Sequence, residues 1–459
     1  MLSRIQKLND VLADWIPPRN TWTPADEALY KPVDLFRVPL GEAQELQLKA
    51  IRYAFTRHYT HNKFYHNYCE AENVRPDDIK TSDDLDKIPL IPDTAYKQQA
   101  SWKEMAHWIA NLYTGDLPRI VIKGTNPTFD DVSTAFKAAG ITILHSSGTS
   151  GKMTVIPKDT KTFKAIQYSG AKGCANLCYD AFVDHALMAI PNPARSGLAI
   201  SLGMDVMVNQ AKKTHYLFDI DMNAEMTQRS MSGNAKPTDA APSSAQGEVL
   251  KRVVARLVRC LEYINKTEET FFIASAPFML LNMMSVLQKE GKSFDFGERG
   301  LIMTGGGWKM GGDARISNGG FRRQVTEVLG IPETHCCDCY SASEINAVLF
   351  ECPEGHYRHV PHTHCKALVV DESFTPVGYG ESGRFALLDA LAHSYPGFVV
   401  LGDEVRMLEH CPVCDRPGPV LESKIERAKG EEVRGCAEEV RRVISDTLAS
   451  NANDAGFLE

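Results

Sequence analysis

The sequence predicts an α/β fold in which a mostly parallel sheet is covered by helices. From about Leu117 onward, short β-branched runs alternate with helical stretches; these runs are RIVIKG, GITILHSS, ALMAIPNP, HYLFDI, FFIASA and GLIMTGGG. Strands that alternate with helices are typical of parallel sheets. The 459 residues are 43% hydrophobic and 24% charged, which is ordinary for a globular protein with a sizeable core.

The regions on either side of this pattern differ from it. Residues 1–110 are expected to be mostly helical, because QELQLKAIRYAFTRHYTHNKFYHNYCEA carries apolar side chains at helical spacing. Residues 350–422 contain short strands and turns, which predict a smaller β-rich lobe within a large domain of residues 1–424. Residues 226–248 are rich in Ser, Ala, Pro and Gly and indicate a surface insertion. Residues 425–459 are expected to form a short C-terminal segment ending in a helix.

Composition and charge exclude several classes of protein. The net charge is −8, from 50 basic and 58 acidic residues, which argues against a nucleic-acid partner. No apolar run approaches the ~20 residues of a membrane span, and the N-terminus lacks the apolar core of a signal peptide. The cysteines concentrate in the last third of a chain without an export signal, so we expect metal or thiol chemistry before disulfides. These features predict a cytoplasmic enzyme.

A polar loop, HSSGTSGKMT, follows one predicted strand. It offers two glycines, one lysine and five hydroxyl side chains: Gly148, Gly151, Lys152, Ser146, Ser147, Thr149, Ser150 and Thr154. Glycines let backbone N–H groups approach an anion, and hydroxyls and a lysine can complete a polyphosphate cradle. The spacing is not that of a Walker A loop, and MTVIP indicates a strand. The loop is therefore expected to join two strands, with a solvated hairpin as the alternative.

Four motifs then follow one another along the chain: SSGTSGKMT, TGGGWK (Thr304–Lys309), YSASE (Tyr340–Glu344) and LGDEVRM (Leu401–Met407). Together they resemble the acyl-adenylate-forming enzymes, a superfamily that includes acyl-CoA ligases, luciferases and nonribosomal adenylation domains. The resemblance implies the large-domain fold of that superfamily, ATP and Mg²⁺ as cofactors, and a small-molecule carboxylic acid as substrate. In such enzymes a carboxylate attacks the α-phosphate of ATP and gives acyl-AMP and pyrophosphate.

The resemblance also implies a role for each motif. The β- and γ-phosphates would lie on the loop, at Ser146, Ser147, Gly148, Thr149, Ser150, Gly151 and Lys152. Adenine would stack on Tyr340 beside Gly305, Gly306 and Gly307, with Ser343 in the same motif. Glu344 would hold Mg²⁺, and Asp403 would accept hydrogen bonds from the ribose hydroxyls. Lys152 and Glu344 are the expected catalytic residues, because donors and a cation stabilise the charge that develops on the phosphates.

The tail narrows the resemblance. Many of these enzymes carry a larger C-terminal domain with a catalytic lysine, but this chain ends 56 residues (459 − 403) after Asp403, so no such lysine is assigned. The short tail, TGGGWK and EVRGCAEEV resemble the acyl-protein synthetase component of the bacterial luciferase fatty-acid reductase. This implies that a fatty or otherwise apolar acyl group passes from AMP to Cys436 and then to a partner, such as an acyl reductase. A CoA ligase of the phenylacetate type is the alternative, and a non-catalytic adenylate- or carboxylate-binding protein is a third.

The cysteine segments predict a structural zinc site. CPVC (Cys411, Cys414) has the spacing of a metal knuckle and needs two further ligands. ECPEGHYRHVPH supplies Cys352 with either His356 or His359, and resemblance to the phenylacetate-ligase branch favours His359. Four unligated residues in a reduced protein are the alternative. The segment HCCDC (His335–Cys339) is a competing source of ligands, although we expect it to shape the adenine pocket.

Overall fold

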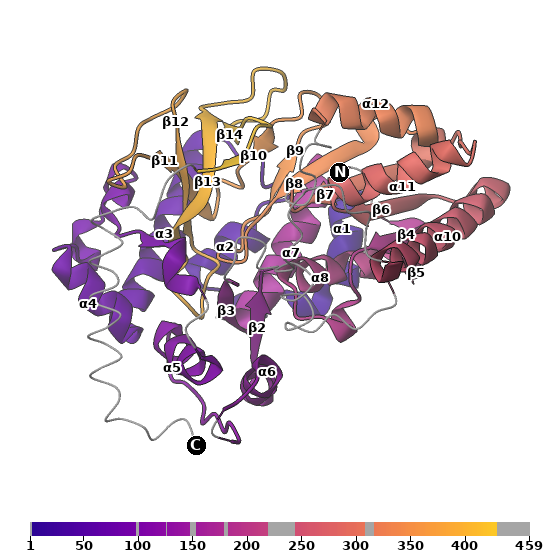
Figure 1. The fold of residues 1–459 in the computed structure, drawn as a ribbon. Coiled ribbons are helices and arrows are strands. Elements are labelled where there is room, and N and C mark those ends of the chain that lie inside the picture. Colours follow the sequence, from indigo (N-terminus) through magenta and orange to yellow (C-terminus); the bar gives the residue numbers. More distant parts are fainter. Residues whose placement is uncertain are drawn as a thin grey trace.

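The computed structural model describes residues 2–97, 101–124, 126–146, 153–178, 182–218, 244–307 and 316–428. Most of its strands join one long mixed sheet with the order β11-β12-β13-β14-β10-β9-β8-β7-β6-β4-β5, and a separate two-stranded sheet holds β2 and β3 (Figure 1). Helices cover the faces of the long sheet. This arrangement confirms the α/β fold class.

One half of the long sheet is parallel. It contains β5 (Ala211–Tyr216), β4 (Val183–Ala189), β6 (Phe271–Ser275), β7 (Gly300–Gly305) and β8 (Cys336–Tyr340). Successive residues of a strand point to opposite faces, so both faces of these strands must be apolar. On one face, Leu187, Ile273 and Ile302 pack with α10 (Ser244–Thr267), α11 (Pro277–Lys289) and α12 (Asn318–Leu329). On the other face, Phe272 and Leu301 pack towards α1 (Leu2–Val11) and α7 (Thr160–Leu177).

The other half is antiparallel. It continues from β8 through β9 (Leu349–Glu351), β10 (Arg358–His359), β14 (Val420–Leu421), β13 (Phe398–Leu408), β12 (Ser382–Asp389) and β11 (Cys365–Val370). Two short strands add to β13: β1 (Ile91–Pro92) runs parallel to it and β15 (Glu426–Arg427) antiparallel. The side chains of β11–β13 share one core with α2 (Pro24–Tyr30), α3 (Leu40–His61), α4 (Lys63–Ala71) and α5 (Trp102–Leu112).

The polar loop joins two strands, as the sequence predicts. β2 (Ile141–His145) pairs antiparallel with β3 (Val155–Asp159), between α6 (Phe129–Ala138) and α7, and α8 (Ala199–Met204) lies beside β2. The expected strand RIVIKG is wrong, because residues 119–124 form no strand. Ile120 is buried whereas Val121 is 48% exposed and Ile122 is half-buried, so the segment fully buries a single side chain. The predicted insertion at 226–248 lies largely outside the described residues.

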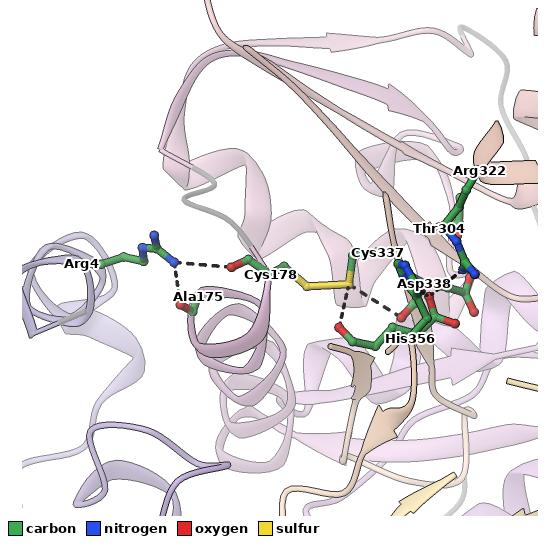
Figure 2. The surroundings of a disulfide bond; sticks show 9 residues. Arg4, Ala175, Cys178, Thr304, Arg322, Cys337, Asp338 and His356 are labelled. Carbon is green, nitrogen blue, oxygen red and sulfur yellow. Dashed lines mark hydrogen bonds and ion pairs between the residues drawn. A yellow bond between two sulfur atoms is a disulfide. The ribbon is translucent and has the colours of Figure 1, made fainter. Parts of the chain in front are cut away.

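A disulfide joins Cys178, just after α7, to Cys337 in β8 (Figure 2). Arg4 of α1 donates to the backbone oxygens of Ala175 and Cys178, 3.1 and 3.4 Å away, at the same end of α7. This bond departs from the expectation that metal or thiol chemistry comes before disulfides in this chain. It ties the end of α7 to β8. In the part of the chain described here, no helix is long and apolar enough to cross a membrane.

Candidate active site

A cavity of about 460 Å³ lies where β7, β8, β13 and β15 meet. It collects residues from each of the four motifs; the lining includes Ser146, Gly306, Gly307, Tyr340, Ser343, Glu344 and Asp403. Ser147, Gly148, Thr149, Ser150, Gly151, Lys152 and Cys436 lie outside the described residues. The motifs that are far apart in the sequence therefore meet around one hollow large enough for a small molecule.

The glycine run explains how β7 ends at this cavity. A Cβ atom on Gly305 would lie 2.9 Å from the sulfur of Cys339, so a side chain there would collide with β8. Gly306 and Gly307 have φ angles of +79° and +66°, which L-residues with side chains rarely adopt. The backbone can thus turn away from the strand and face the cavity without side chains in between.

Tyr340 and Asp403 meet on one wall. The Tyr340 hydroxyl donates to Asp403 Oδ2 at 2.9 Å, and Arg427 Nη1 lies 3.3 Å from Asp403 Oδ1. Burial, together with the neighbouring Asp403 carboxylate, raises the pKa of Tyr340, so the phenol remains a donor at neutral pH. The Tyr340 ring packs edge-on against Phe385, with ring centroids 5.6 Å apart. This wall presents an aromatic ring beside an acceptor carboxylate.

Glu344 is joined to the base of the polar loop. Its side chain is almost fully buried and accepts a hydrogen bond from Thr154 Oγ1 at 2.8 Å. The Thr154 backbone N–H donates to Ser146 Oγ at 2.9 Å, which closes the loop at its base. Lys97 Nζ lies 2.9 Å from Thr154 Oγ1 and 3.9 Å from Glu344 Oε1. A cation, a hydroxyl and a carboxylate therefore converge beside the loop.

Sequence reasoning missed Lys97. It follows the short η5 turn (Asp93–Tyr96) after β1, and its Nζ also lies 3.2 Å from Asp93 Oδ2. Neither motif spacing nor helical periodicity distinguishes this lysine from the many exposed ones. Only the packing of the N-terminal helical region against β13 brings it to the cavity.

A buried charge network also lines the cavity. Asp338 Oδ1 accepts from Thr304 Oγ1 at 2.6 Å, and Asp338 Oδ2 lies 2.5 Å from Arg358 Nη2. Glu351 Oε1 lies 3.6 Å from Arg358 Nη2, and Glu351 Oε2 lies 3.6 Å from Arg322 Nη1. Burial raises the pKa of Asp338, while the Arg358 guanidinium favours its charged form. Sequence reasoning missed this network, although Asp338 lies two residues before Tyr340 in a strand and therefore on the same face of it.

Figure 2 shows part of this network beside the disulfide. Four residues of HCCDC, namely Cys336, Cys337, Asp338 and Cys339, line the cavity. That position agrees with the expectation that this segment shapes the pocket. None of its cysteines belongs to the metal-type cluster found among the described residues.

The predicted zinc ligands lie together. One donor atom from each of Cys352, His359, Cys411 and Cys414 falls within 4.8 Å of the others. Cys352 Sγ and Cys411 Sγ are 3.9 Å apart, and Cys414 Sγ is 3.4 Å from His359 Nε2. His356, the alternative ligand, is not in the cluster; it has a φ of +55° and its Nδ1 lies 3.5 Å from Glu351 Oε2. The cluster therefore contains His359 in place of His356.

Comparisons with known proteins agree with these observations. Residues 237–445 match the family "Acyl-protein synthetase, LuxE". The long-chain-fatty-acid–luciferin-component ligase of Aliivibrio fischeri is 23% identical over 408 residues, covering 89% of this chain and 91% of that protein. The ligase of the same name from Vibrio harveyi is 25% identical over 401 residues, covering 87% and 88%. The chain is related to the acyl-protein synthetases.

Solved structures agree on the fold. A 2-hydroxyisobutyryl-CoA ligase, solved in an open conformation with its acyl-AMP and CoA, matches with a TM-score of 0.58 and 14% identity, over 87% of this chain and 73% of that one. The same ligase in its thioesterification state matches with a TM-score of 0.57 and 15% identity, over 90% of this chain and 72% of that one. The chain thus has the fold of the adenylate-forming ligases.

Proposed function

We propose that this enzyme activates a long-chain fatty acid with ATP and passes the acyl group to a cysteine thiol of a protein. The observation that carries the proposal is the meeting of Glu344, Thr154, Lys97, Tyr340 and Asp403 around one cavity. The match to the acyl-protein synthetases and the names of its two relatives support the fatty acid and the protein acceptor.

In the first step, a carboxylate oxygen of the acid attacks the α-phosphorus of ATP. The bond from that phosphorus to the bridging oxygen breaks, and pyrophosphate leaves. The loop from Ser146 to Lys152 would hold the β- and γ-phosphates, and Lys97 would add a second cation beside Thr154. Asp403 would accept from the ribose hydroxyls, and Tyr340 would stack on adenine. Most of the rate enhancement would come from charge stabilisation and positioning.

Glu344 and the Thr154 hydroxyl suit Mg²⁺, because both offer hard oxygen ligands next to the loop. A divalent cation bound there would neutralise charge on the phosphates. The Lys97 ammonium, 3.9 Å from Glu344, compensates part of the carboxylate charge in the absence of a cation. The residues present therefore fit the cation that the family implies.

In the second step, the sulfur of Cys436 attacks the acyl carbon of acyl-AMP, the bond from that carbon to the phosphate oxygen breaks, and AMP leaves. The thiol proton is lost to solvent before the attack. The resulting thioester would then be available to an acyl reductase or another acceptor protein. The proposal requires Cys436 to reach the cavity in this step and the acceptor protein in the next.

The experiment is intact-protein mass spectrometry after incubation with ATP, Mg²⁺ and a panel of carboxylic acids. Wild type should gain one hydroxylamine-sensitive acyl group without CoA. Cys436→Ser should keep acid-dependent ATP–pyrophosphate exchange and lose the label. Cys260→Ser, at a half-buried cysteine of α10, is the matched control and should still label. Efficient acyl-CoA synthesis without self-labelling would favour the CoA-ligase alternative, and absence of exchange would refute adenylation.

We also propose that Cys352, His359, Cys411 and Cys414 hold a structural Zn²⁺. Tetrahedral zinc with Zn–S distances of about 2.3 Å places its sulfurs about 3.8 Å apart, and Cys352 and Cys411 are separated by 3.9 Å. The Cys414 N–H points at Cys411 Sγ from 3.5 Å, an arrangement that supports a thiolate. Bound zinc would cross-link the β9–β10 hairpin to the turn after β13.

A further inference from the structure

We propose that Lys158 is a positioning residue for Glu344, and that it acts through Tyr395 and Asn346. The inference rests on the proposed function, in which Glu344 binds the divalent cation. Lys158 is on β3, the strand that leaves the phosphate-binding loop, and its side chain is fully buried. A fully buried lysine calls for a specific explanation, because lysine almost never loses all contact with water unless it is paired.

The Lys158 ammonium holds both ends of a short segment. Its Nζ donates to Asn346 Oδ1 at 2.5 Å and to the Tyr395 hydroxyl at 2.9 Å. The Tyr395 hydroxyl in turn donates to the backbone oxygen of Glu344 at 3.0 Å. One lysine amino group therefore fixes the backbone at Glu344 and the side chain two residues later.

A buried carboxylate balances the charge. Asp389 is fully buried and accepts the backbone N–H of Asn346, so this residue lies between the ammonium and the carboxylate. Asp389 also accepts the N–H of Leu391 at 2.9 Å. Burying such charges costs several kcal/mol per ion, and apolar residues of similar volume often stabilise a fold at least as well. Stability alone therefore does not account for a lysine at this place.

The position of Lys158 between the loop and Glu344 does account for a buried lysine. The carboxylate of Glu344 must face both the cation and the phosphates on the loop, although 190 residues separate it from Thr154, its hydrogen-bond partner. Lys158 is four residues beyond Thr154 and connects the same strand to the Glu344 segment. A displacement of about 1 Å in a reacting group can cost about 10²-fold in rate.

The chain contains a matched control. Lys172 on α7 is also buried, with 1% of its surface exposed, and its Nζ donates to the backbone oxygen of Leu29 at 2.7 Å. Lys172 does not line the cavity. Lys158→Met and Lys172→Met thus remove the same buried charge, and only the first acts on Glu344. Tyr395→Phe removes the link to the Glu344 carbonyl and leaves Lys158 in place.

The test measures Mn²⁺ binding by electron paramagnetic resonance with ATP present, and the Mg²⁺ dependence of palmitate-dependent ATP–pyrophosphate exchange. Loss of an outer partner of a metal ligand commonly weakens metal binding about 10–100-fold. We expect weakening of that size in Lys158→Met and Tyr395→Phe, and none in Lys172→Met. Thermal unfolding of each variant shows whether it folds; if Lys158→Met does not, Tyr395→Phe decides.

Two results would overturn the inference: wild-type Mn²⁺ binding in both Lys158→Met and Tyr395→Phe, or equal weakening in all three variants, which would mean a general effect on the fold. The proposed function fails separately. If wild type binds Mn²⁺ with ATP but never exchanges pyrophosphate with any acid, adenylation is refuted. The positioning role would still stand on the Mn²⁺ measurements.

Discussion

The cavity and the metal-type cluster are built on the same hairpin, one residue apart. Glu351 and Arg358 pair across β9 and β10 and line the cavity, whereas the next residues, Cys352 and His359, belong to the cluster. Because successive side chains of a strand point to opposite sides, the alternation separates charges from metal-type ligands. The cavity is open to a ligand, while the cluster gathers its four donors within 4.8 Å.

The cavity and the cluster therefore depend on the β9–β10 hairpin in different ways. The cluster needs only its own four side chains to be closed, so changes in the cavity should leave it intact. The cavity needs the hairpin in place, because Glu351 and Arg358 form part of its wall. Changes in the cluster should therefore reach the cavity, and not the reverse.

The largest expected effect breaks the charge network. Arg358→Met leaves Asp338 and Glu351 without their common cation, which lies 2.5 and 3.6 Å from them. Removing one partner of a buried ion pair costs about 3–5 kcal/mol. Denaturant unfolding should show this loss, and Arg358→Met/Asp338→Leu should recover part of it. A metal content below that of wild type in folded Arg358→Met would contradict the expectation that changes in the cavity leave the cluster intact.

Breaking the cluster should cost nearly as much. Cys411→Ser/Cys414→Ser should lose about one equivalent of zinc, measured by elemental analysis of protein purified without added metal. At a free zinc concentration 1,000 times its dissociation constant, the lost stability is about 4 kcal/mol. Exchange activity should fall as well, because the hairpin shifts. Equal zinc in the variant and wild type would point to other ligands, and zinc in neither would mean that the cluster is unligated.

A change at Glu344, which lines the cavity, should lower activity and leave the cluster intact. Glu344→Gln should reduce acid-dependent ATP–pyrophosphate exchange by about 10²–10³-fold, or about 2.7–4 kcal/mol, through loss of charge stabilisation. Its zinc content should equal that of wild type. Glu404→Gln, at an exposed position of β13, is the control and should exchange normally. Unchanged exchange in Glu344→Gln would remove this residue from the chemistry.

The smallest expected effect concerns pH. Burial lowers the pKa of Lys158 to about 7. Between that value and the ordinary lysine value of about 10.4, the unfolded chain binds a proton that the folded chain does not, so stability rises with pH. We expect a contribution of up to about 1.4 kcal/mol per pH unit above pH 7, absent in Lys158→Met. Denaturant unfolding between pH 7 and the onset of thiol ionisation near 8.5 measures it; an equal slope in both proteins would contradict it.

Much of the fold could be predicted from the sequence. The apolar runs at β4, β6 and β7 predict strands that are buried on both faces, and the strands on either side of the polar loop follow from local composition. RIVIKG has a composition that suits a strand, but within the described residues it forms none. Local sequence records the preference for extended backbone, whereas pairing is decided by distant segments.

The candidate site divides in the same way. The motifs around Tyr340, Glu344 and Asp403 were visible because each is a short run of unusual residues, and the Cys and His spacing indicated a metal-type cluster. The sequence left His356 and His359 as alternatives, and the β9–β10 register decided between them. Lys97 and Lys158 gave no local signal, because the residues next to a lysine in the sequence do not reveal whether the fold buries it.

Residue types and local backbone preferences thus come from the sequence: most of the strands, the glycine turn at Gly306 and Gly307, and the paired cysteines Cys411 and Cys414. Only the tertiary structure decided which charges share a buried space, such as Lys158 with Asn346 and Tyr395, or Asp338 with Arg358. The physical reason is that propensity and turn chemistry act over a few residues, whereas desolvation and ion pairing depend on whatever the fold places within a few ångströms.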